Sequence, residues 1–489
     1  NLCKGRTKVF SRLFLRFRKA IRVRDKTGNV IKISFLLHHF LFYIFFFSPM
    51  TIPNIEEFDV FPNSGFLPSK LPLERLPQEY YQPWENIVNN LPSLILTKRI
   101  RAIIDKLPVL ETTHLTSDEE YRRAYQILGF LAHAYIWGTD TPTDKLPSQI
   151  ATPWIKVSDH LGLPPIATYA SLCLWNFKQI MPSDDIWDLD NLTTINTFTG
   201  SIDESWFYLV SVYFEHKGAL AITTGLDAIK CAYDNNTKGL VENLQQLAEA
   251  IDSLGSVLMK MEEMCDPHVF YFRIRPYLAG WKNMTEVGLK GVYYGEEKTV
   301  RNYAGGSNAQ SSLIQFLDIL LGVKHYSTGE RPLPFKASTG VGAENGFMNE
   351  MREYMPGNHQ KFLSKIQEIT NINQYVLDHK DSHPELVLSY DACLAMLKLF
   401  RDKHIQIVTR YVVLQAKKTE KMGSSSTLRS GLARKKKEER GTGGTSLLPF
   451  LKQCRDETGD PAAGNWGQRI LSDGVMRLKF SKPNGINED

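Results

Sequence analysis

Apolar residues recur at helical spacing through most of the chain beyond residue 80. Ser117 and Asp118 give one of these segments a favourable helix start, and strand signals are few. The spacing predicts helices over residues 83–105, 117–137, 166–179, 205–233, 241–264, 311–323, 348–370 and 386–416. We therefore predict a mainly α fold, with a small N-terminal helical domain and a large, bundle-like C-terminal helical domain.

The domain boundaries follow from shifts in this pattern. Residues 182–204 are polar and weakly periodic, which indicates a linker between the two domains. Residues 417–440 have little apolar content and hold a basic cluster, so we expect a flexible surface loop there. We place a non-globular segment at 1–49, the small domain at 50–198, the large domain at 199–456 and a tail at 457–489.

The first 49 residues differ in character from the rest. A basic stretch is followed by the apolar run 33–47, which is 15 residues long and holds two histidines. This is short of the roughly 20 residues that a spanning helix needs. Three interpretations fit: a signal peptide or anchor, an organelle presequence, or untranslated sequence upstream of a start at Met50. We favour the last, because Met50 opens an ordinary globular chain and nothing before it has globular patterning.

Charge and cysteine content narrow the function classes. The 489 residues carry a net charge of +5, but residues 1–32 hold eleven Lys or Arg side chains and one acid, leaving about −5 for the remainder. The body of the chain therefore gives no reason to expect nucleic-acid binding. The six cysteines include no CxxC pair, which indicates a reducing compartment and no disulfide framework.

His404 is the first candidate for chemistry. At helical spacing its neighbours are apolar, including Leu397, Phe400 and Tyr411, so its side chain projects from the apolar stripe of a helix. One interpretation is a core histidine bonded to a carbonyl. The other is an axial ligand of haem iron, which calls for an acceptor on its second ring nitrogen.

Two rival sites are weaker. His379, Asp381 and His383 resemble the ligand set of a non-haem iron oxygenase, but the β scaffold that usually carries such ligands is not evident. Residues 441–445, Gly-Thr-Gly-Gly-Thr, resemble a phosphate loop without the following Gly-Lys-Ser/Thr or a preceding strand.

Two further segments could bind an anionic ligand. Residues 303–312 include Gly305-Gly306-Ser307 and run into a helix, whose free amides suit a carboxylate, although most such loops are only turns and caps. Tyr271 and Arg275 stand one helical turn apart, so an aromatic wall and a cation could face one cavity and take a flat ligand bearing a carboxylate. The alternative is a core aromatic beside a surface arginine.

Together these segments resemble the indoleamine 2,3-dioxygenase family. Each motif is short, but seven occur in the family's order between about residues 55 and 456. The matching stretches are 163–176, 206–222, 270–281, 304–322, 351–362, 390–411 and 441–455. Tyr271 departs from the pattern, because the best-known members carry Phe there.

The resemblance implies a haem enzyme with its cofactor between the two domains. His404 matches the proximal ligand of haem b. Phe207 and Ser211 match a distal-pocket pair, and Tyr169 matches an aromatic from the small domain. The other implied site residues are Phe270 against the indole, Arg275 on the substrate carboxylate, Tyr271, Gly306 and Ser307 by the haem edge, and Thr442 on a mobile loop.

The implied reaction inserts both atoms of O2 across the indole C2=C3 bond of L-tryptophan to give N-formylkynurenine, the first step of the kynurenine pathway. We also expect an electron donor that reduces ferric haem, and a cytoplasmic location. We expect no membrane association for residues 50–489, and a monomeric state. Two other classes stay open. One is a haem and O2 carrier or sensor with little turnover, and the other is a helical scaffold without haem in which His404 is a core residue.

Overall fold

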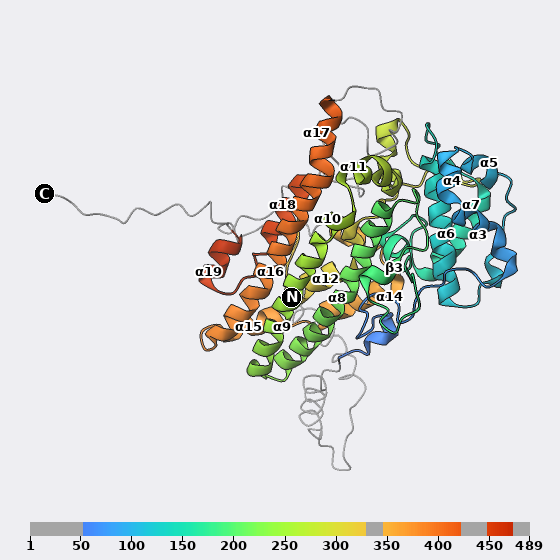
Figure 1. The fold of residues 1–489 in the computed structure, drawn as a ribbon. Helices are drawn as coiled ribbons and strands as arrows, with labels where there is room; N and C mark the ends of the chain where they lie inside the picture. Colours follow the sequence, from blue (N-terminus) through green and yellow to red (C-terminus); the bar gives the residue numbers. More distant parts are fainter. Residues whose placement is uncertain (1–51, 329–345, 422–446, 473–489) are drawn as a thin grey trace, which may run out of the picture. The chain divides into compact units, whose positions relative to one another are not determined.

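The computed structural model describes residues 52–328, 346–421 and 447–472 (Figure 1). Residues from Pro53 onward form one compact unit. The unit is built almost entirely of helices, so the predicted mainly α fold class is confirmed. The division into a small and a large helical domain at residues 198 and 199 stays a prediction.

The α-helices of the described residues vary from single turns to a helix of 32 residues. They are α3 (Gln82–Asn89), α4 (Leu91–Leu96), α5 (Ile100–Ile104), α6 (Asp118–Trp137), α7 (Ser148–Leu161), α8 (Ile202–Tyr233), α9 (Thr237–Met259), α10 (Met261–Met264), α11 (Pro267–Val269), α12 (Ser312–Leu320), α13 (Gly346–Arg352), α14 (Gly357–Ile369), α15 (Ile372–His379), α16 (Pro384–Val408), α17 (Leu414–Lys421), α18 (Leu447–Glu457) and α19 (Asn465–Gly467).

The strands of the described residues are only two residues long. Strand β1 (Lys145–Leu146) pairs in parallel with β4 (Tyr293–Tyr294). Strand β2 (Lys178–Gln179) pairs antiparallel with β3 (Leu192–Thr193). These pairs fasten loops to helices and do not form a layer of the fold.

Helices α3 to α7 gather around α6, the blue and cyan group of Figure 1. Helix α6 starts where the sequence predicts, because the Ser117 hydroxyl accepts a hydrogen bond from the amide of Glu120. The predicted helix 83–105 is instead three short helices. Helix α4 begins at Leu91 after a break at Asn90, with Pro92 in its first turn. Lys98, with a left-handed φ of 57°, follows the end of α4.

A buried ion pair holds this group together. The Arg123 guanidinium meets both carboxylate oxygens of Glu85, at 2.7 and 3.1 Å, and both side chains are 1% exposed. The same guanidinium donates to the side-chain oxygens of Gln126 and Asn196, at 2.7 and 2.6 Å. One arginine therefore ties α3 and α6 to the chain just before α8.

Three long helices, α8, α9 and α16, lie side by side and form the core of the remaining part (Figure 1). Most residues of α8 are buried, but a stripe that includes Lys217, Leu220 and Asp227 is exposed. Helix α12 approaches α8 where glycines leave room: a Cβ on Gly218 would stand 2.0 Å from a methyl of Leu313, and one on Gly225 2.6 Å from a methyl of Leu320.

Two predictions need correction. The predicted helix 166–179 contains only a single π-helical turn, Ala170–Leu174. It ends because the Asn176 side chain donates to the carbonyls of Leu172 and Asn196, which replaces helical bonding. The predicted helix 348–370 is divided into α13 and α14, since Pro356 stands immediately before α14 and cannot continue a helix.

The C-terminal part also differs from expectation. The predicted helix 386–416 is confirmed as α16, a π-helical turn (Thr409–Val413) and α17. Helix α17 extends into the predicted loop 417–440, whose residues from 422 on lie outside the described residues. The start of the predicted tail is held on α16, because the Asp391 carboxylate accepts from the amides of Ala463 and Gly464, at 2.8 and 3.0 Å.

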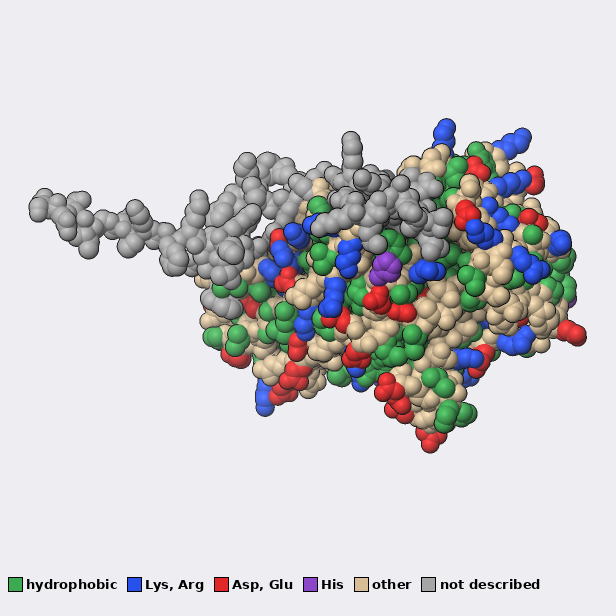
Figure 2. All heavy atoms as spheres, turned by 45° about the horizontal axis from the view of Figure 1, so that its top comes forward, with side chains coloured by type: hydrophobic (Ala, Val, Ile, Leu, Met, Phe, Trp, Pro, Cys, Tyr) green, Lys and Arg blue, Asp and Glu red, His purple; other side chains and the backbone are tan. Residues whose placement is uncertain are grey.

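On the face in Figure 2, Lys and Arg side chains are interspersed with Asp and Glu, so neither sign of charge gathers there. Five described cysteines (Cys173, Cys231, Cys265, Cys393 and Cys454) are free thiols. Among the described helices, none combines the length and the apolar composition that crossing a bilayer requires.

We predict that Glu85→Ala lowers the free energy of unfolding by about 3–5 kcal/mol, because it leaves the Arg123 charge buried without its partner. Asp140→Ala is the matched control. It removes the partner of Lys98 in a pair whose side chains are 64% and 58% exposed, and the expected loss is below about 1 kcal/mol. The free energies of unfolding are measured by denaturant titration. Equal losses in the two variants would show that the buried pair stabilises the fold no more than the exposed pair does.

Candidate active site

The predicted site residues converge on one cavity of about 270 Å³ with a mostly apolar and aromatic wall. Its walls come from segments far apart in sequence: the chain around Tyr169, helix α8, the segment after α11, the loop 306–311, helix α16 and helix α18. Of the predicted residues, those on the wall are Tyr169, Phe207, Ser211, Phe270, Arg275, Gly306, Ser307 and His404.

Three π-helical turns border this cavity. Ala170–Leu174 contributes Leu172 and Cys173, Phe270–Ile274 contributes Phe270, and Thr409–Val413 contributes Tyr411 and Val412. A π turn widens a helix and occurs often at functional sites. Apolar spacing does not distinguish it from an α-helical turn, so the sequence analysis did not find these turns.

His404 is a neutral imidazole on the cavity wall. Burial, with a smaller contribution from the positive charge of Arg401, lowers the pKa of His404 to about 4. The ring is therefore uncharged at pH 7 and offers a lone pair. Neither ring nitrogen has a hydrogen-bond partner among the described residues, so the second acceptor that a haem ligand calls for is not found there.

His133 is another buried histidine, and it shows how both ring nitrogens of a core histidine find hydrogen-bond partners in this fold. Burial lowers the pKa of His133 to about 4 as well. Its Nδ1 donates to the carbonyl of Tyr277 at 2.7 Å, and its Nε2 accepts from the amide of Ala167 at 3.2 Å. His404 has no such pair of bonds, which distinguishes it from a core histidine.

Aromatic rings line the cavity between α8 and α16. The rings of Phe207 and Phe270 lie 4.9 Å apart between centroids, and Tyr411 meets Phe270 edge-on at 5.8 Å. Phe214 stacks on Phe400 at 5.5 Å. Such flat apolar surfaces suit a planar ligand.

Arg275 brings a buried cation to this wall. Arg275 is only 3% exposed, and its guanidinium carbon lies 5.3 Å from the centroid of the Tyr271 ring. Tyr271 itself does not line the cavity of the described residues. We expected the Tyr271 ring and the Arg275 cation to face one cavity. Only Arg275 does so, and Tyr271 packs on the guanidinium of Arg275 instead.

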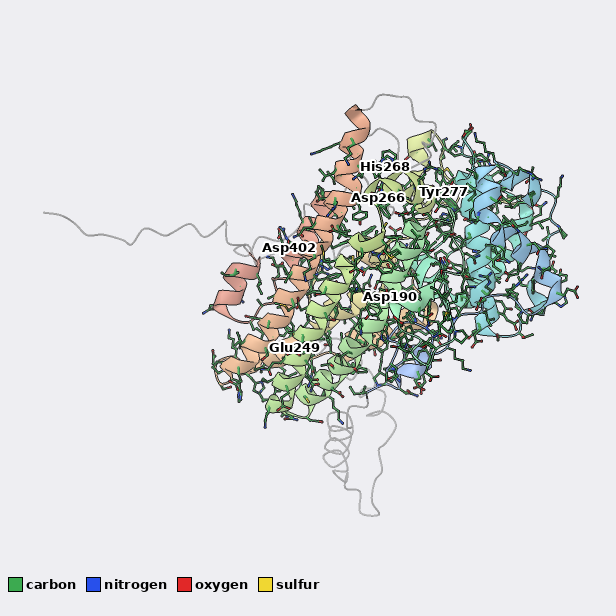
Figure 3. All side chains as sticks on the ribbon, viewed as in Figure 1. Asp190, Glu249, Asp266, His268, Tyr277 and Asp402 are labelled. Atoms are coloured by element: carbon green, nitrogen blue, oxygen red, sulfur yellow. The ribbon has the colours of Figure 1, made fainter. Side chains whose placement is uncertain are left out.

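The segment that carries Phe270 and Arg275 is fixed at both ends. At its start, the Asp266 carboxylate accepts from the amides of His268 and Val269, at 2.8 and 3.0 Å, and Asp266 and His268 lie close together in Figure 3. At its end, the Tyr277 ring stacks on Phe198 at 5.0 Å. These anchors hold the direction in which the intervening side chains point.

The glycine-rich loop owes its composition to close backbone contact. A Cβ on Gly280 would stand 2.1 Å from the nitrogen of Gly305, and one on Gly305 only 2.0 Å from the carbonyl oxygen of Leu278. A Cβ on Gly306 would meet a methyl of Leu172 at 2.4 Å. Gly280 and Gly305 therefore let the loop press against the segment that carries Arg275, and Gly306 lets the loop approach Leu172.

Ser307 acts as a cap within this loop. Its hydroxyl accepts a hydrogen bond from the amide of Ala309, at the start of the 3-10 turn Asn308–Gln310. Gln310 then links the loop to the chain around Tyr169. Its side-chain nitrogen donates to the carbonyl of Gly305, and its oxygen accepts from the amide of Tyr169, both at 2.9 Å. This arrangement supports the turn-and-cap interpretation of the segment.

Glu215, one helical turn after Ser211, is a buried acid that the sequence analysis overlooked. Its Oε1 accepts from the hydroxyls of Tyr169 and Ser311, at 3.0 and 2.6 Å, while its buried Oε2 has no partner among the described residues. Burial raises the pKa of Glu215 to about 7 despite these two bonds. A lone acid within the apolar pattern of α8 was the signal that could have identified it.

The remaining predicted sites do not join the cavity. His379 Nδ1 donates to the carbonyl of Tyr375 at 2.8 Å, and His383 pairs with Glu385 at 3.2 Å. With Asp381 they lie at the junction of α15 and α16, and they do not form the iron triad of the weaker rival site. Thr442 and the loop 441–445 lie outside the described residues.

Glu215 should make stability depend on pH. Its pKa is raised from 4.5 to about 7 in the folded chain, so the folded state holds the proton more tightly than the unfolded state. The stabilisation is complete below pH 4.5 and is lost as pH rises through about 7, by on the order of 3 kcal/mol. Glu215→Gln keeps the acceptor oxygen but removes this dependence.

The measurement compares the free energy of unfolding of wild type and Glu215→Gln between pH 4.5 and 8. The expected difference changes steadily with pH in favour of the variant. Glu249→Gln, at an exposed position of α9 (Figure 3), serves as the control. Parallel curves for wild type and Glu215→Gln would contradict the assignment.

Comparison with known proteins assigns the chain to a family. Residues 54–461 match the family model described as indoleamine 2,3-dioxygenase. The chain is 46% identical to the indoleamine 2,3-dioxygenase of Saccharomyces cerevisiae over 83% of its own length and 93% of the yeast protein. It is 40% identical to an indoleamine 2,3-dioxygenase of Aspergillus nanangensis, covering 84% of this chain and 97% of that protein.

A third relative carries a more specific name. The chain is 36% identical to the 6-hydroxytryptophan 2,3-dioxygenase of Fusarium equiseti over 83% of its length and 96% of that protein. The model match covers most of the chain, and the identities exceed those at which a family is in doubt. With the cavity and its residues, these matches establish that this chain belongs to the indoleamine 2,3-dioxygenase family of oxidoreductases.

Proposed function

We propose that this protein is a haem-dependent dioxygenase that converts L-tryptophan and O2 to N-formylkynurenine, the first step of the kynurenine pathway. One observation carries the proposal: a neutral imidazole, His404, faces a mostly apolar cavity without a hydrogen-bond partner among the described residues. A core histidine would have its nitrogens satisfied, as His133 does. The monomeric state and the cytoplasmic location stay predictions.

The residues of the cavity fit a haem. His404 would hold the iron through a ring nitrogen, which must be unprotonated to bind a metal, and its low pKa meets that condition at pH 7. The aromatic rings around it would pack against a flat macrocycle. Haem, when bound, supplies the iron that activates O2 for insertion of both oxygen atoms across the indole C2=C3 bond.

The protein's own residues bind and orient the substrate. Phe207 and Phe270 offer apolar surfaces to the indole ring, and Tyr169 closes the wall beside them. The Arg275 guanidinium pairs with the substrate carboxylate, a charge-assisted bond strengthened by the apolar surroundings. Tyr271 acts indirectly, as a positioning residue that holds the guanidinium in place.

Polar groups on the cavity wall complete the site. The Ser211 hydroxyl is a donor on the same face of α8 as Phe207. The Tyr169 hydroxyl donates to Glu215 and stays protonated, because burial and the nearby carboxylate raise the pKa of Tyr169 well above its usual 10. The loop at Gly306 and Ser307 borders the cavity. The closing of Thr442 over the ligand stays a prediction, because Thr442 lies outside the described residues.

The first test is an absorption spectrum of the full chain supplied with haem, followed by addition of L-tryptophan and a reductant in air. A Soret band and growing N-formylkynurenine absorbance are expected. Because one relative is named for 6-hydroxytryptophan, that compound is assayed in parallel. A Soret band without turnover of either compound would favour a carrier or sensor, and the absence of the band would favour the haem-free scaffold.

We predict that His404→Ala abolishes haem retention while leaving the helical content unchanged, because the variant removes the only group proposed to bind the iron. The readout is the ratio of Soret to protein absorbance after gel filtration, with circular dichroism as a check of folding. His359→Ala is the control, since burial also lowers the pKa of His359 to about 4 but its ring packs on Phe66, away from the cavity. A normal haem spectrum in His404→Ala would refute the ligand assignment.

We predict that Arg275→Ala raises KM for L-tryptophan by roughly 10- to 150-fold, the value of one hydrogen-bonded charge pair of about 1.5–3 kcal/mol. The Soret band should be retained. Arg273→Ala, an exposed arginine of the same turn, is the matched control and should leave KM unchanged. Unaltered kinetics in Arg275→Ala would remove this residue from the substrate site.

A further inference from the structure

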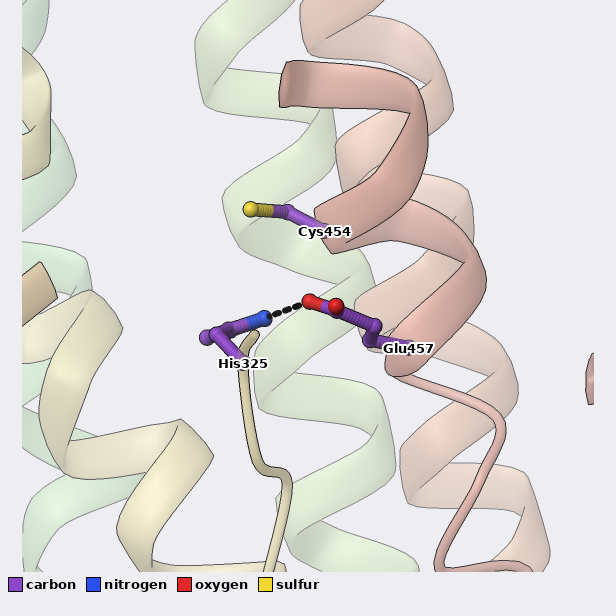
Figure 4. Close-up of side chains that lie close together, drawn as sticks. All are labelled: His325, Cys454 and Glu457. Atoms are coloured by element: carbon purple, nitrogen blue, oxygen red, sulfur yellow. Dashed lines mark hydrogen bonds and ion pairs between the residues drawn. The ribbon is translucent and has the colours of Figure 1, made fainter. Parts of the chain in front are cut away.

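Three potential metal ligands, His325, Cys454 and Glu457, lie close together at the edge of the cavity that α18 forms. His325 follows α12, whereas Cys454 and Glu457 lie one turn apart on α18. Figure 4 shows His325 and Glu457 directed at each other, with Cys454 close by. Their ligand atoms all lie within 4.8 Å of one another. In the described part of the chain, this is the one cluster of His, Cys, Asp and Glu side chains with that property.

Surrounding hydrogen bonds orient two of the three ligands. The Nε2 of His325 lies 3.1 Å from Asp318 Oδ2, which leaves Nδ1 directed at Glu457. In metal sites, a carboxylate on the second nitrogen of a ligating histidine fixes the ring in this manner. The Oε1 of Glu457 accepts from the amide of Tyr326 at 3.1 Å and from the side chain of Gln453 at 2.7 Å, so Oε2 remains for a ligand.

The cluster lies within a network of buried ion pairs. Asp318 pairs with Arg401 and His325, and Glu457 pairs with His325. A divalent ion binds a histidine and a cysteine only through a ring nitrogen and a sulfur that carry no proton, so its binding releases protons.

We propose that His325 Nδ1, Cys454 Sγ and Glu457 Oε2 form a binding site for one Zn²⁺ ion. The combination of nitrogen, sulfur and oxygen ligands is one that zinc accepts. Because His325 and Cys454 both line the cavity, the fourth position of a tetrahedral ion faces it and takes water. The ion fastens α18 to the chain that follows α12.

For His325 and Glu457 the geometry needs only a small adjustment, and Cys454 Sγ lies within 4.8 Å of both ligand atoms. His325 Nδ1 and Glu457 Oε2 are 2.7 Å apart, the distance of a hydrogen bond. Around a tetrahedral zinc ion with ligands near 2 Å, the same two atoms stand about 3.3 Å apart. A separation of roughly half an ångström is within side-chain rotation, and it replaces the hydrogen bond with two metal bonds.

The test measures zinc per chain by plasma mass spectrometry. The full-length protein is incubated with Zn²⁺ and then passed over a desalting column. We expect close to one zinc ion per chain for wild type, and at least a tenfold loss for Cys454→Ser and for Glu457→Gln. Cys231→Ser is the matched control, because Cys231 is a half-buried free thiol of α8 outside the cluster. Iron in the same samples reports haem, so the result does not depend on the proposed function.

Thermal unfolding gives a second readout that does not require high affinity. At a zinc concentration a hundred times Kd, Tm of wild type should rise by about 2–5 °C, whereas the two cluster variants should not respond. A variant that fails to fold is recognised by circular dichroism and replaced by Cys454→Ala. Zinc content and Tm that are the same in wild type and Cys454→Ala would overturn the site and leave the cluster as an ion-pair network.

Discussion

Exclusion of bulk water from the side chains buried between α8 and α16 is the constraint on which the other features of the site depend. It keeps His404 neutral and holds a proton on Glu215, because a charge on either group would be poorly solvated. It also strengthens the electrostatic attraction between Arg275 and a carboxylate of the ligand. A site of this kind selects a ligand that is flat, apolar and anionic at one end.

Close contact between backbones makes that exclusion possible. Gly280 and Gly305 leave no space between the loop and the segment that carries Arg275, and Gly218 and Gly225 let α12 approach α8. Anchors outside the cavity, such as the Asp266 cap, then fix the direction of the lining side chains. The chemistry of the cavity is therefore set by residues that do not line it.

The sequence predicted the long helices and the start of α6, since both depend on local patterns that α-helices share. Resemblance to a family named eight of the residues that line the cavity. Neither approach could find the pairing of Arg123 with Glu85, which depends on contact between segments 38 residues apart. Helix α7 was not predicted, because Pro153 within it counts against a helix.

The π-helical turn at Thr409–Val413 has a consequence for comparison among relatives. Such a turn accommodates one residue more than an α-helical turn, and one residue corresponds to about 100° of rotation around a helix axis. A relative with a single deletion at this point would keep His404 on the same face of α16 but would rotate everything beyond it. A one-residue gap in an alignment at this turn would therefore indicate that α17 points in a different direction in that relative.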